Sequence, residues 1–261
     1  MRGLIGRTAL LTGASSGLGP PIARRLHVEG VRLALSGRQQ DALASLTREL
    51  VGSRAIQADL TRRGDVRRLA TQAGPVDILV ANAGLPGHGV FEETSLDDLD
   101  TVLEVNLRAP MRLARLLLPG MLERGGGHVV LMASMAGQAP SAYQAVYGAT
   151  KAGLRAFGHS LRAELKGTGV GVSVVSPYFV RDAGFWAAGG HHAPLEVSPQ
   201  QVADAVAAAI REDRAEVTVA PLPARLTHRI PTAFPELLQL GLARSIASGA
   251  AGAGRGRRQL A

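Results

Sequence analysis

The sequence predicts a single α/β domain whose parallel sheet has about seven strands and carries helices on both faces. Two observations lead to this fold. Short apolar runs alternate with longer helical segments between Thr8 and Ala220, and runs such as Asp77–Ala81 and His128–Met132 are almost continuously apolar. Strands buried on both faces have this pattern, and regular alternation with helices is typical of a doubly wound sheet. A length of 261 residues can form one such domain.

Each element follows from its local pattern. The apolar runs predict strands, and segments with apolar residues at helical spacing predict the helices between them. Three consecutive glycines at 125–127 end the longest helical segment. The expected strands are 8–11, 31–36, 54–58, 76–81, 128–133, 169–176 and 216–220, and the expected helices are about 20–29, 41–50, 64–72, 96–123, 147–166 and 199–211.

Composition limits the possible chemistry. The chain has no cysteine, which excludes disulfides, thiolate metal sites and a cysteine nucleophile, and which fits a cytoplasmic protein. Its formal charge is +8, but the arginines are scattered except for the tail cluster Arg255, Arg257 and Arg258. We interpret this charge as attraction for anionic small molecules, with no nucleic-acid partner expected, although an RNA-associated function stays open. We expect neither a signal peptide nor a membrane span, because no apolar run approaches about 20 residues.

A glycine-rich loop follows the first expected strand. Residues 12–19 read Thr-Gly-Ala-Ser-Ser-Gly-Leu-Gly and lead directly into a helix. Glycines at such a junction let a dinucleotide pyrophosphate approach the backbone, and the helix N-terminus offers N–H groups to the anion. The loop therefore predicts a Rossmann-like cofactor site that uses Gly13, Ser15, Ser16, Gly17, Leu18 and Gly19; an ordinary glycine turn is the alternative.

The end of the second expected strand indicates which dinucleotide binds. A carboxylate at this point would bind the ribose hydroxyls of NAD and repel the additional phosphate of NADP. The sequence has Ser36-Gly37-Arg38 instead, and a guanidinium can hold a phosphate through two hydrogen bonds. We therefore expect NADP(H) to be favoured over NAD(H), with a solvated, helix-capping Arg38 as the alternative.

Four polar residues form a candidate catalytic group. Ser134 ends the fifth expected strand, Tyr147 follows thirteen residues later, and Lys151 lies one helical turn further on. Residues four apart share a helix face, so the ammonium is expected beside the phenol, where a cation favours the phenolate. Hydride exchange at a carbonyl or carbinol carbon needs an acid/base group at the oxygen, which Tyr147 can supply. Asn106 could hold a water that links Lys151 to solvent.

Together these motifs resemble the short-chain dehydrogenase/reductase family over residues 6–220. The loop residues Thr12, Gly13, Gly17 and Gly19 match in place, as does Asn82-Ala83-Gly84 after the fourth strand. The resemblance implies that Asn106, Ser134, Tyr147 and Lys151 form the catalytic tetrad, and that Tyr147 and Lys151 also contact the cofactor. It further implies cofactor contacts by Asp59, Leu60, Asn82, Ala83, Gly84, Pro177 and Val180, and a homodimer or homotetramer.

The sequence departs from the family pattern in three places. Ser16 stands where some NADP-preferring members carry a basic residue, and Tyr178 and Asp182 replace the usual glycine and threonine after the sixth strand. Residues 181–197 are expected to form a substrate lid containing Phe185 and Trp186, although Trp186 could simply pack between helices. Tyr143 and Gln144 are expected to line the substrate pocket. His191 and His192 lack further ligands at a suitable spacing, so we expect no metal.

The chain after the last expected strand is the least defined part. We expect residues 1–221 to form the cofactor-binding and catalytic domain and residues 222–261 to be an extension of it with a frayed basic tail. Residues 235–244 could form a helix over the pocket, at a subunit interface or at a membrane surface. The sequence thus predicts an NADP(H)-dependent oxidoreductase acting on a small carbonyl or alcohol substrate. A dinucleotide-binding regulatory protein without turnover remains the alternative.

Overall fold

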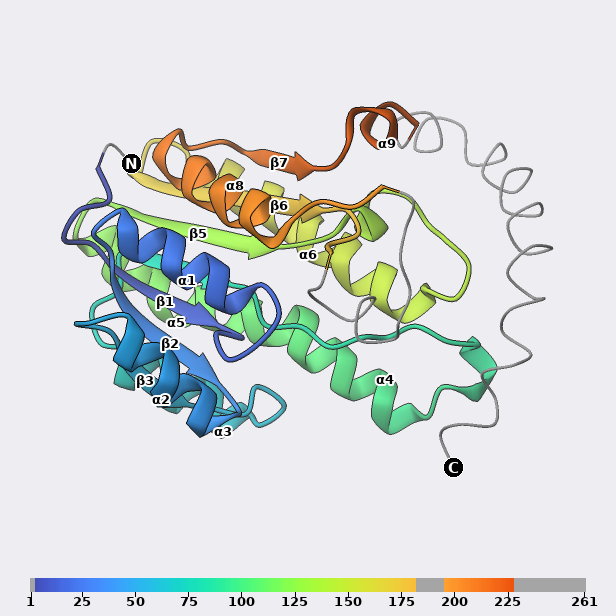
Figure 1. The fold of residues 1–261 in the computed structure, drawn as a ribbon, viewed down its shortest axis with the longest axis horizontal. Helices are drawn as coiled ribbons and strands as arrows, with labels where there is room; N and C mark the ends of the chain where they lie inside the picture. The colour runs from blue at the N-terminus through green and yellow to red at the C-terminus, as the bar shows by residue number, and fades with distance from the viewer. Residues whose placement is uncertain (1–2, 182–194, 228–261) are drawn as a thin grey trace.

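A computed structural model gives the fold of the chain, and it describes residues 3–181 and 195–227 (Figure 1). Within them, a seven-stranded sheet has the order β3-β2-β1-β4-β5-β6-β7, and every neighbouring pair is parallel. The predicted doubly wound sheet is confirmed. Its strands are β1 (Thr8–Thr12), β2 (Arg32–Gly37), β3 (Arg54–Gln57), β4 (Ile78–Ala81), β5 (Gly127–Met132), β6 (Val170–Pro177) and β7 (Glu216–Val219).

The helices lie on both faces of the sheet. Apolar side chains of α1, α2 and α8 form one core cluster with the sheet, and those of α3, α5 and α6 form a second cluster on the opposite face. In Figure 1, α1 and α8 cross the near face side by side. The helices are α1 (Gly19–Val28), α2 (Gln40–Glu49), α3 (Arg63–Ala73), α4 (Leu96–Leu103), α5 (Ala109–Glu123), α6 (Ala145–Glu164), α8 (Pro199–Arg211) and α9 (Leu222–Thr227).

Three short helical segments were not expected from the sequence. The 3-10 turns η1 (Phe91–Glu93) and η3 (Met135–Gly137) lie in segments that we expected to be loops, and α9 begins the C-terminal extension. The expected long helix 96–123 is interrupted by a π-helical turn, η2 (Glu104–Arg108). π-Helical turns are rare in proteins, but those that occur are often found at functional sites. The turn η2 carries Asn106.

The strand order places a candidate ligand site at one end of the sheet. The order reverses between β1 and β4, and ligands of open α/β sheets bind at the carboxyl ends of the strands beside such a switch point. The loop after β1, the segment after β4 and the turn after β5 all leave the sheet at this end. In Figure 1 the strand arrows point toward the side where α4 and α9 lie.

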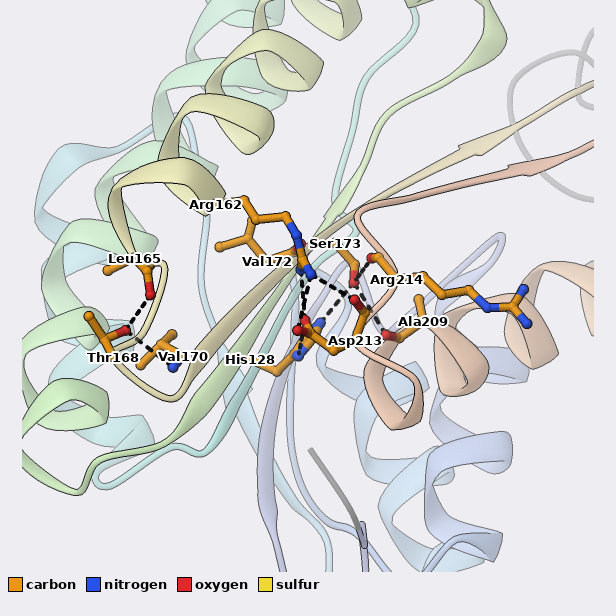
Figure 2. Close-up of polar contacts among 10 residues, drawn as sticks. All are labelled: His128, Arg162, Leu165, Thr168, Val170, Val172, Ser173, Ala209, Asp213 and Arg214. Atoms are coloured by element: carbon orange, nitrogen blue, oxygen red, sulfur yellow. Dashed lines mark hydrogen bonds and ion pairs between the residues drawn. The ribbon is translucent and has the colours of Figure 1, made fainter.

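The opposite end of the sheet contains a polar network that is buried at His128 and Ser173 and exposed at Asp213 (Figure 2). His128 on β5 is buried, and its Nε2 lies 2.8 Å from the Ser173 hydroxyl, which donates to the Arg214 carbonyl. Arg162 on α6 donates from Nη1 and Nη2 to the Asp213 carboxylate at 2.7 and 3.0 Å. A Cβ on Gly171 would lie 2.5 Å from both His128 Nδ1 and Asp213 Oδ1, so this packing requires glycine. The network ties β5, β6, α6 and the α8–β7 connection together.

Within the described residues, no helix combines the length and the apolar character that a membrane crossing requires. The same part of the chain contains no group of three or more histidine or acidic side chains arranged to hold a metal ion.

Candidate active site

The glycine loop has the backbone that a close anion approach requires. Gly13 and Gly17 have φ angles of +66° and +57°, in the left-handed region that favours glycine. A Cβ on Gly13 would lie 2.8 Å from Ala83 Cα, and one on Gly19 would clash with the Gly13 carbonyl. Pro20 and Pro21 lie in the first turn of α1, where backbone amides lack intrahelical partners. The glycines therefore leave no side chain between a ligand and the backbone of the loop at the N-terminus of α1.

Asn82 fastens this loop to the end of β4. Its side-chain amide donates to the Thr12 carbonyl at 3.0 Å and to the Gly13 carbonyl at 3.3 Å. The Thr12 hydroxyl accepts in return from the amides of Asn82 and Ala83, both at 3.1 Å. The predicted Asn82-Ala83-Gly84 segment is thus in contact with the predicted glycine loop, and Thr12 serves as the anchor between them.

The ends of β2 and β3 border a groove of about 560 Å³. Arg38 and Asp59 line it, as do Gln57 and Arg62. Asp59 Oδ1 accepts from the Thr61 amide at 3.0 Å and from the Thr61 hydroxyl at 2.8 Å. These two hydrogen bonds stabilise the turn between Asp59 and Thr61. The next helix begins at residue 63 with Arg62 as N-cap, so Asp59 does not cap that helix. Leu60 is buried beside it.

Ser15 lies against the end of β2. A Cβ on Gly37 would be 2.6 Å from the Ser15 hydroxyl oxygen, so glycine at 37 lets the loop approach the strand that precedes Arg38. Ser16, Gly17 and Arg38 are exposed, and Leu18 is half-buried. The predicted cofactor-binding residues of the first two strand ends therefore lie in one region.

The three predicted catalytic side chains of β5 and α6 also meet. The Ser134 hydroxyl is hydrogen-bonded to the Tyr147 phenol and accepts from the Ala136 amide at 3.2 Å. Lys151 is buried, and its Nζ donates to the Met132 carbonyl at 2.8 Å and lies 5.6 Å from the centroid of the Tyr147 ring. His88, which we did not single out, packs edge-on against the Tyr147 ring at 5.3 Å.

Burial dominates the acid/base properties of this pair. It raises the pKa of Tyr147, and the hydrogen bond with Ser134 only partly opposes that change. We expected Lys151 to lower this pKa, and the net shift has the opposite direction because the phenol is desolvated. Burial also lowers the pKa of Lys151 to about 8. Tyr147 is consequently protonated at neutral pH.

Asn106 links the Asn82-Ala83-Gly84 segment to α6. Its carboxamide accepts from the Leu85 amide at 2.7 Å and donates to the Leu85 carbonyl at 3.0 Å. It also donates to the Thr150 hydroxyl at 3.3 Å, and that hydroxyl donates to the Tyr147 carbonyl. Asn106 lies in the middle of the π-helical turn η2. Asn106 therefore contacts the backbone that supports Tyr147, and Leu85 and Thr150 are partners that the sequence did not reveal.

The substrate end is described only in part. Pro177 is buried at the end of β6, and Val180 pairs with Val197 in a parallel bridge, which brings the two ends of the predicted lid together. Tyr143 is exposed with a φ of +63°, and Gln144 is the N-cap residue of α6. The remaining predictions for this end fall on Phe185, Trp186, His191, His192, Asp182, the segment 235–244 and the basic tail, which lie outside the described residues.

Comparisons with known proteins identify the family. A family model described as short chain dehydrogenase matches residues 7–189. The chain is 40% identical over 230 residues to the ketoacyl reductase HetN of a Nostoc species, covering 84% of this chain and 80% of HetN. It also matches the structure of a short-chain dehydrogenase from Sphingobium yanoikuyae in complex with NADPH, at 29% identity and a TM-score of 0.79, covering 89% of this chain and 95% of that one.

A third similarity is to a variant of an actinorhodin polyketide ketoreductase, solved with NADPH. It has 30% identity and a TM-score of 0.74, and the match covers 84% of this chain and 98% of that one. The family match, the parallel sheet, and the placement of the glycine loop after β1 and of Ser134 after β5 agree with one another. The chain belongs to the short-chain dehydrogenase family of oxidoreductases.

Proposed function

We propose that the protein is an NADP(H)-dependent oxidoreductase that reduces a carbonyl group or oxidises the corresponding alcohol, with Tyr147 as the general acid/base. One observation carries this proposal: the Tyr147 phenol is hydrogen-bonded to Ser134 and lies beside a buried lysine one helical turn away. The nicotinamide supplies or accepts the hydride when bound, so the protein must move the matching proton at the substrate oxygen.

The protonation state of Tyr147 fits a role as proton donor in carbonyl reduction. The phenol carries its proton at neutral pH and could give it to the carbonyl oxygen as that oxygen gains electron density, with Lys151 and the bound cofactor offsetting the cost of the phenolate. Ser134 would hydrogen-bond the same oxygen and orient it. The buried Lys151 would hold the cofactor's ribose and offset the charge of a phenolate left after proton transfer. Asn106 would act by positioning the backbone around Tyr147.

The residues fit a dinucleotide. A Cβ would fill the space at Gly13, so the cradle exists only because glycine stands there. Arg38 is exposed and follows Gly37, which packs against Ser15 of this loop, so its guanidinium could bind the 2′-phosphate of NADP. Two similar structures contain NADPH, which supports the same cofactor here. Asp59 and Leu60 would border the adenine, and Val180 the nicotinamide carboxamide.

Cofactor preference is tested by substitution at Arg38. Arg38→Asp should weaken NADPH binding by at least tenfold while NADH affinity is unchanged or improved, because the carboxylate repels the phosphate and can bind ribose hydroxyls. Fluorescence titration with both cofactors measures this change. Unaltered selectivity would remove Arg38 from the assignment.

The substrate class is best approached through the relatives. Two of them are named for the reduction of ketones, one as a ketoacyl reductase and the other as a polyketide ketoreductase. We therefore propose an apolar ketone or a β-ketoacyl thioester as substrate, with Tyr143, Gln144, Phe185 and Trp186 at its binding end. We further propose a cytoplasmic homodimer or homotetramer, which light scattering of the purified protein tests.

Turnover is tested with a panel of simple ketones, quinones and β-ketoacyl thioesters, followed by NADPH absorbance at neutral pH. We expect oxidation of NADPH with at least one carbonyl and, with the alcohol product and NADP, the reverse reaction at higher pH. Tight NADPH binding without oxidation across the panel would favour the regulatory alternative instead.

A further inference from the structure

The catalytic face of α6 continues beyond the candidate active site. Tyr147, Lys151, Arg155 and His159 follow one another at intervals of four residues along this helix, which places them in one slowly drifting stripe. The first two residues belong to the candidate active site. The other two turn toward a single carboxylate on the edge strand β7.

That carboxylate belongs to Glu216, the first residue of β7. Arg155 donates to it through Nε at 2.7 Å and through Nη2 at 2.8 Å, and His159 Nε2 lies 3.0 Å from its second oxygen. The Glu216 side chain is only 20% exposed. Burial opposes its ionisation, but the interactions with Arg155, His159 and Gln138 leave its pKa below the usual value. The two parallel hydrogen bonds between Arg155 and Glu216 fix the orientation of both side chains more strictly than an ordinary surface ion pair does.

Glu216 also holds the turn that begins with Ser134. Gln138 ends the turn η3, and its side-chain amide donates to Glu216 Oε1 at 2.9 Å and to the Thr218 hydroxyl at 3.2 Å. Ser134 is the N-cap residue at the other end of the same turn. The side chain of Gln138 therefore fixes the far end of the segment that presents Ser134.

This turn lies directly on the backbone of Lys151. A Cβ on Gly137 would be 2.6 Å from the Lys151 carbonyl carbon and 2.8 Å from the Ala152 nitrogen. Any rotation of η3 would therefore press on the part of α6 that carries the catalytic lysine. Glu216 holds both sides of this contact, since it binds α6 through Arg155 and η3 through Gln138.

We infer that Glu216 is a positioning residue, which together with Arg155 and Gln138 fixes the Ser134 turn in register with the helix that carries Tyr147 and Lys151. The inference rests on the proposed function, because it assumes that the hydroxyls of Ser134 and Tyr147 must meet at one substrate oxygen. A misplacement of about 1 Å at such a site can cost about 100-fold in rate. The bond between Gln138 and Glu216 restrains that kind of displacement.

The test uses Gln138→Ala and Glu216→Gln in the full-length protein. The matched control is Glu49→Gln, which breaks a similar two-bond pair with Arg24 on the exposed surface, where α2 meets α1. Two quantities are measured for each protein. The first is hydrogen exchange of the amides of residues 137–139, which donate to carbonyls within the turn, without cofactor or substrate. The second is kcat and KM for NADPH with the best carbonyl substrate.

We expect Gln138→Ala to speed exchange in the turn and to lower kcat about tenfold, with the KM for NADPH within twofold of wild type and the urea midpoint nearly unchanged. A variant that combines Gln138→Ala with Glu216→Gln should lose no more kcat than the worse single variant, because both substitutions break the same connection between Gln138 and Glu216. Glu49→Gln should leave both quantities at the wild-type value.

Exchange and kcat in Gln138→Ala that match the Glu49→Gln control would overturn the inference. So would a Glu216→Gln variant that is less stable yet keeps wild-type kcat and exchange, since the pair would then be structural only. Wild-type protein that oxidises no NADPH contradicts the proposed function, whereas unchanged exchange in an active Gln138→Ala variant contradicts the inference alone.

Discussion

The ammonium nitrogen of Lys151 lies 5.6 Å from the centroid of the Tyr147 ring, with its hydrogen bond directed to the Met132 carbonyl. The lysine is therefore beside the phenol but held by the strand that leads to Ser134. Burial sets the protonation of both groups. It raises the pKa of the Tyr147 phenol, which therefore holds its proton more strongly than usual. It lowers the pKa of the Lys151 ammonium, which therefore holds its proton less strongly. This relationship gives the pair a pH dependence that can be measured in the stability of the protein.

Lys151→Met should remove a stability gain at alkaline pH. The pKa of Lys151 is about 8 in the folded chain against an ordinary 10.5, so the unfolded chain binds more protons between these values and wild-type stability rises with pH there. At about 1.4 kcal/mol per pKa unit, the rise approaches about 3 kcal/mol. Urea unfolding at pH 7.5 and pH 10 measures it.

The second lysine of the sequence provides the control for that experiment. Lys166 is exposed after the end of α6, and Lys166→Met should keep the wild-type rise. Unfolding free energies of wild type and Lys151→Met that run parallel over this pH range would show that Lys151 is not desolvated as described.

Gly13→Ala should disable the cofactor cradle. The new Cβ would lie 2.8 Å from Ala83 Cα in a backbone with a φ of +66°, so either the loop or the Asn82-Ala83-Gly84 segment must move. We expect NADPH affinity to fall at least tenfold in a fluorescence titration. Gly64→Ala, where the added methyl meets open space, should bind NADPH normally. Equal affinity of the two variants would argue against the loop as the pyrophosphate site.

Asn106→Asp should destabilise the protein although it preserves shape. The carboxylate can still accept from the Leu85 amide, but it cannot donate to the Leu85 carbonyl or to Thr150, and it puts a charge in a fully buried position. An unsatisfied buried group costs about 1–3 kcal/mol and a charged one costs more. We expect a loss of at least about 2 kcal/mol in urea unfolding at pH 7. An unchanged midpoint would mean that the clamp on Leu85 is dispensable.

His128→Gln should make the protein less sensitive to acid. Burial lowers the pKa of His128 to about 4 from 6.5. Its stabilising neutral form is therefore complete above pH 6.5, and the stability is lost as the pH falls toward 4, because the unfolded chain takes up the proton first. At about 1.4 kcal/mol per unit, wild type should lose about 3 kcal/mol through this group. Glutamine can keep the hydrogen bond to Ser173 without titrating (Figure 2).

The corresponding measurement is urea unfolding at pH 7 and pH 4.5. The difference between the two pH values should be smaller for His128→Gln than for wild type. His27→Gln, on α1 and outside this network, should behave as wild type. A wild-type difference that persists in His128→Gln would assign the acid sensitivity to other groups.

Patterns that depend on local sequence predicted most of the fold. The strand at 54–57 and the helix at 199–211 begin where apolar periodicity and turn residues place them, and helix 199–211 begins with a complete capping box from Ser198 and Gln201. The glycine loop was recognisable because its spacing serves backbone geometry. The expected strand 76–81 is shorter in the structure and begins at Ile78, while the Asp77 side chain accepts from the Thr8 amide.

Features that depend on distant contacts could not be predicted. The π-helical turn at Asn106 accompanies contacts of this residue with Leu85 and Thr150, 21 and 44 positions away, and its local sequence reads as ordinary helix. Glu216 meets Gln138 across 78 positions and carries no motif. The direction of the Tyr147 pKa also depends on burial, which spacing along one helix does not reveal.

The central claim is that Tyr147 gives the proton while NADPH gives the hydride. The most direct test is single-turnover oxidation of bound NADPH by a carbonyl substrate in wild type and in Tyr147→Phe, with NADPH affinity titrated in parallel. We expect the phenylalanine variant to bind NADPH within about threefold of wild type and to oxidise it at least about 1,000-fold more slowly, in line with the upper part of the ~10²–10⁴-fold range of general acid catalysis. A variant that oxidises NADPH at the wild-type rate would contradict the claim.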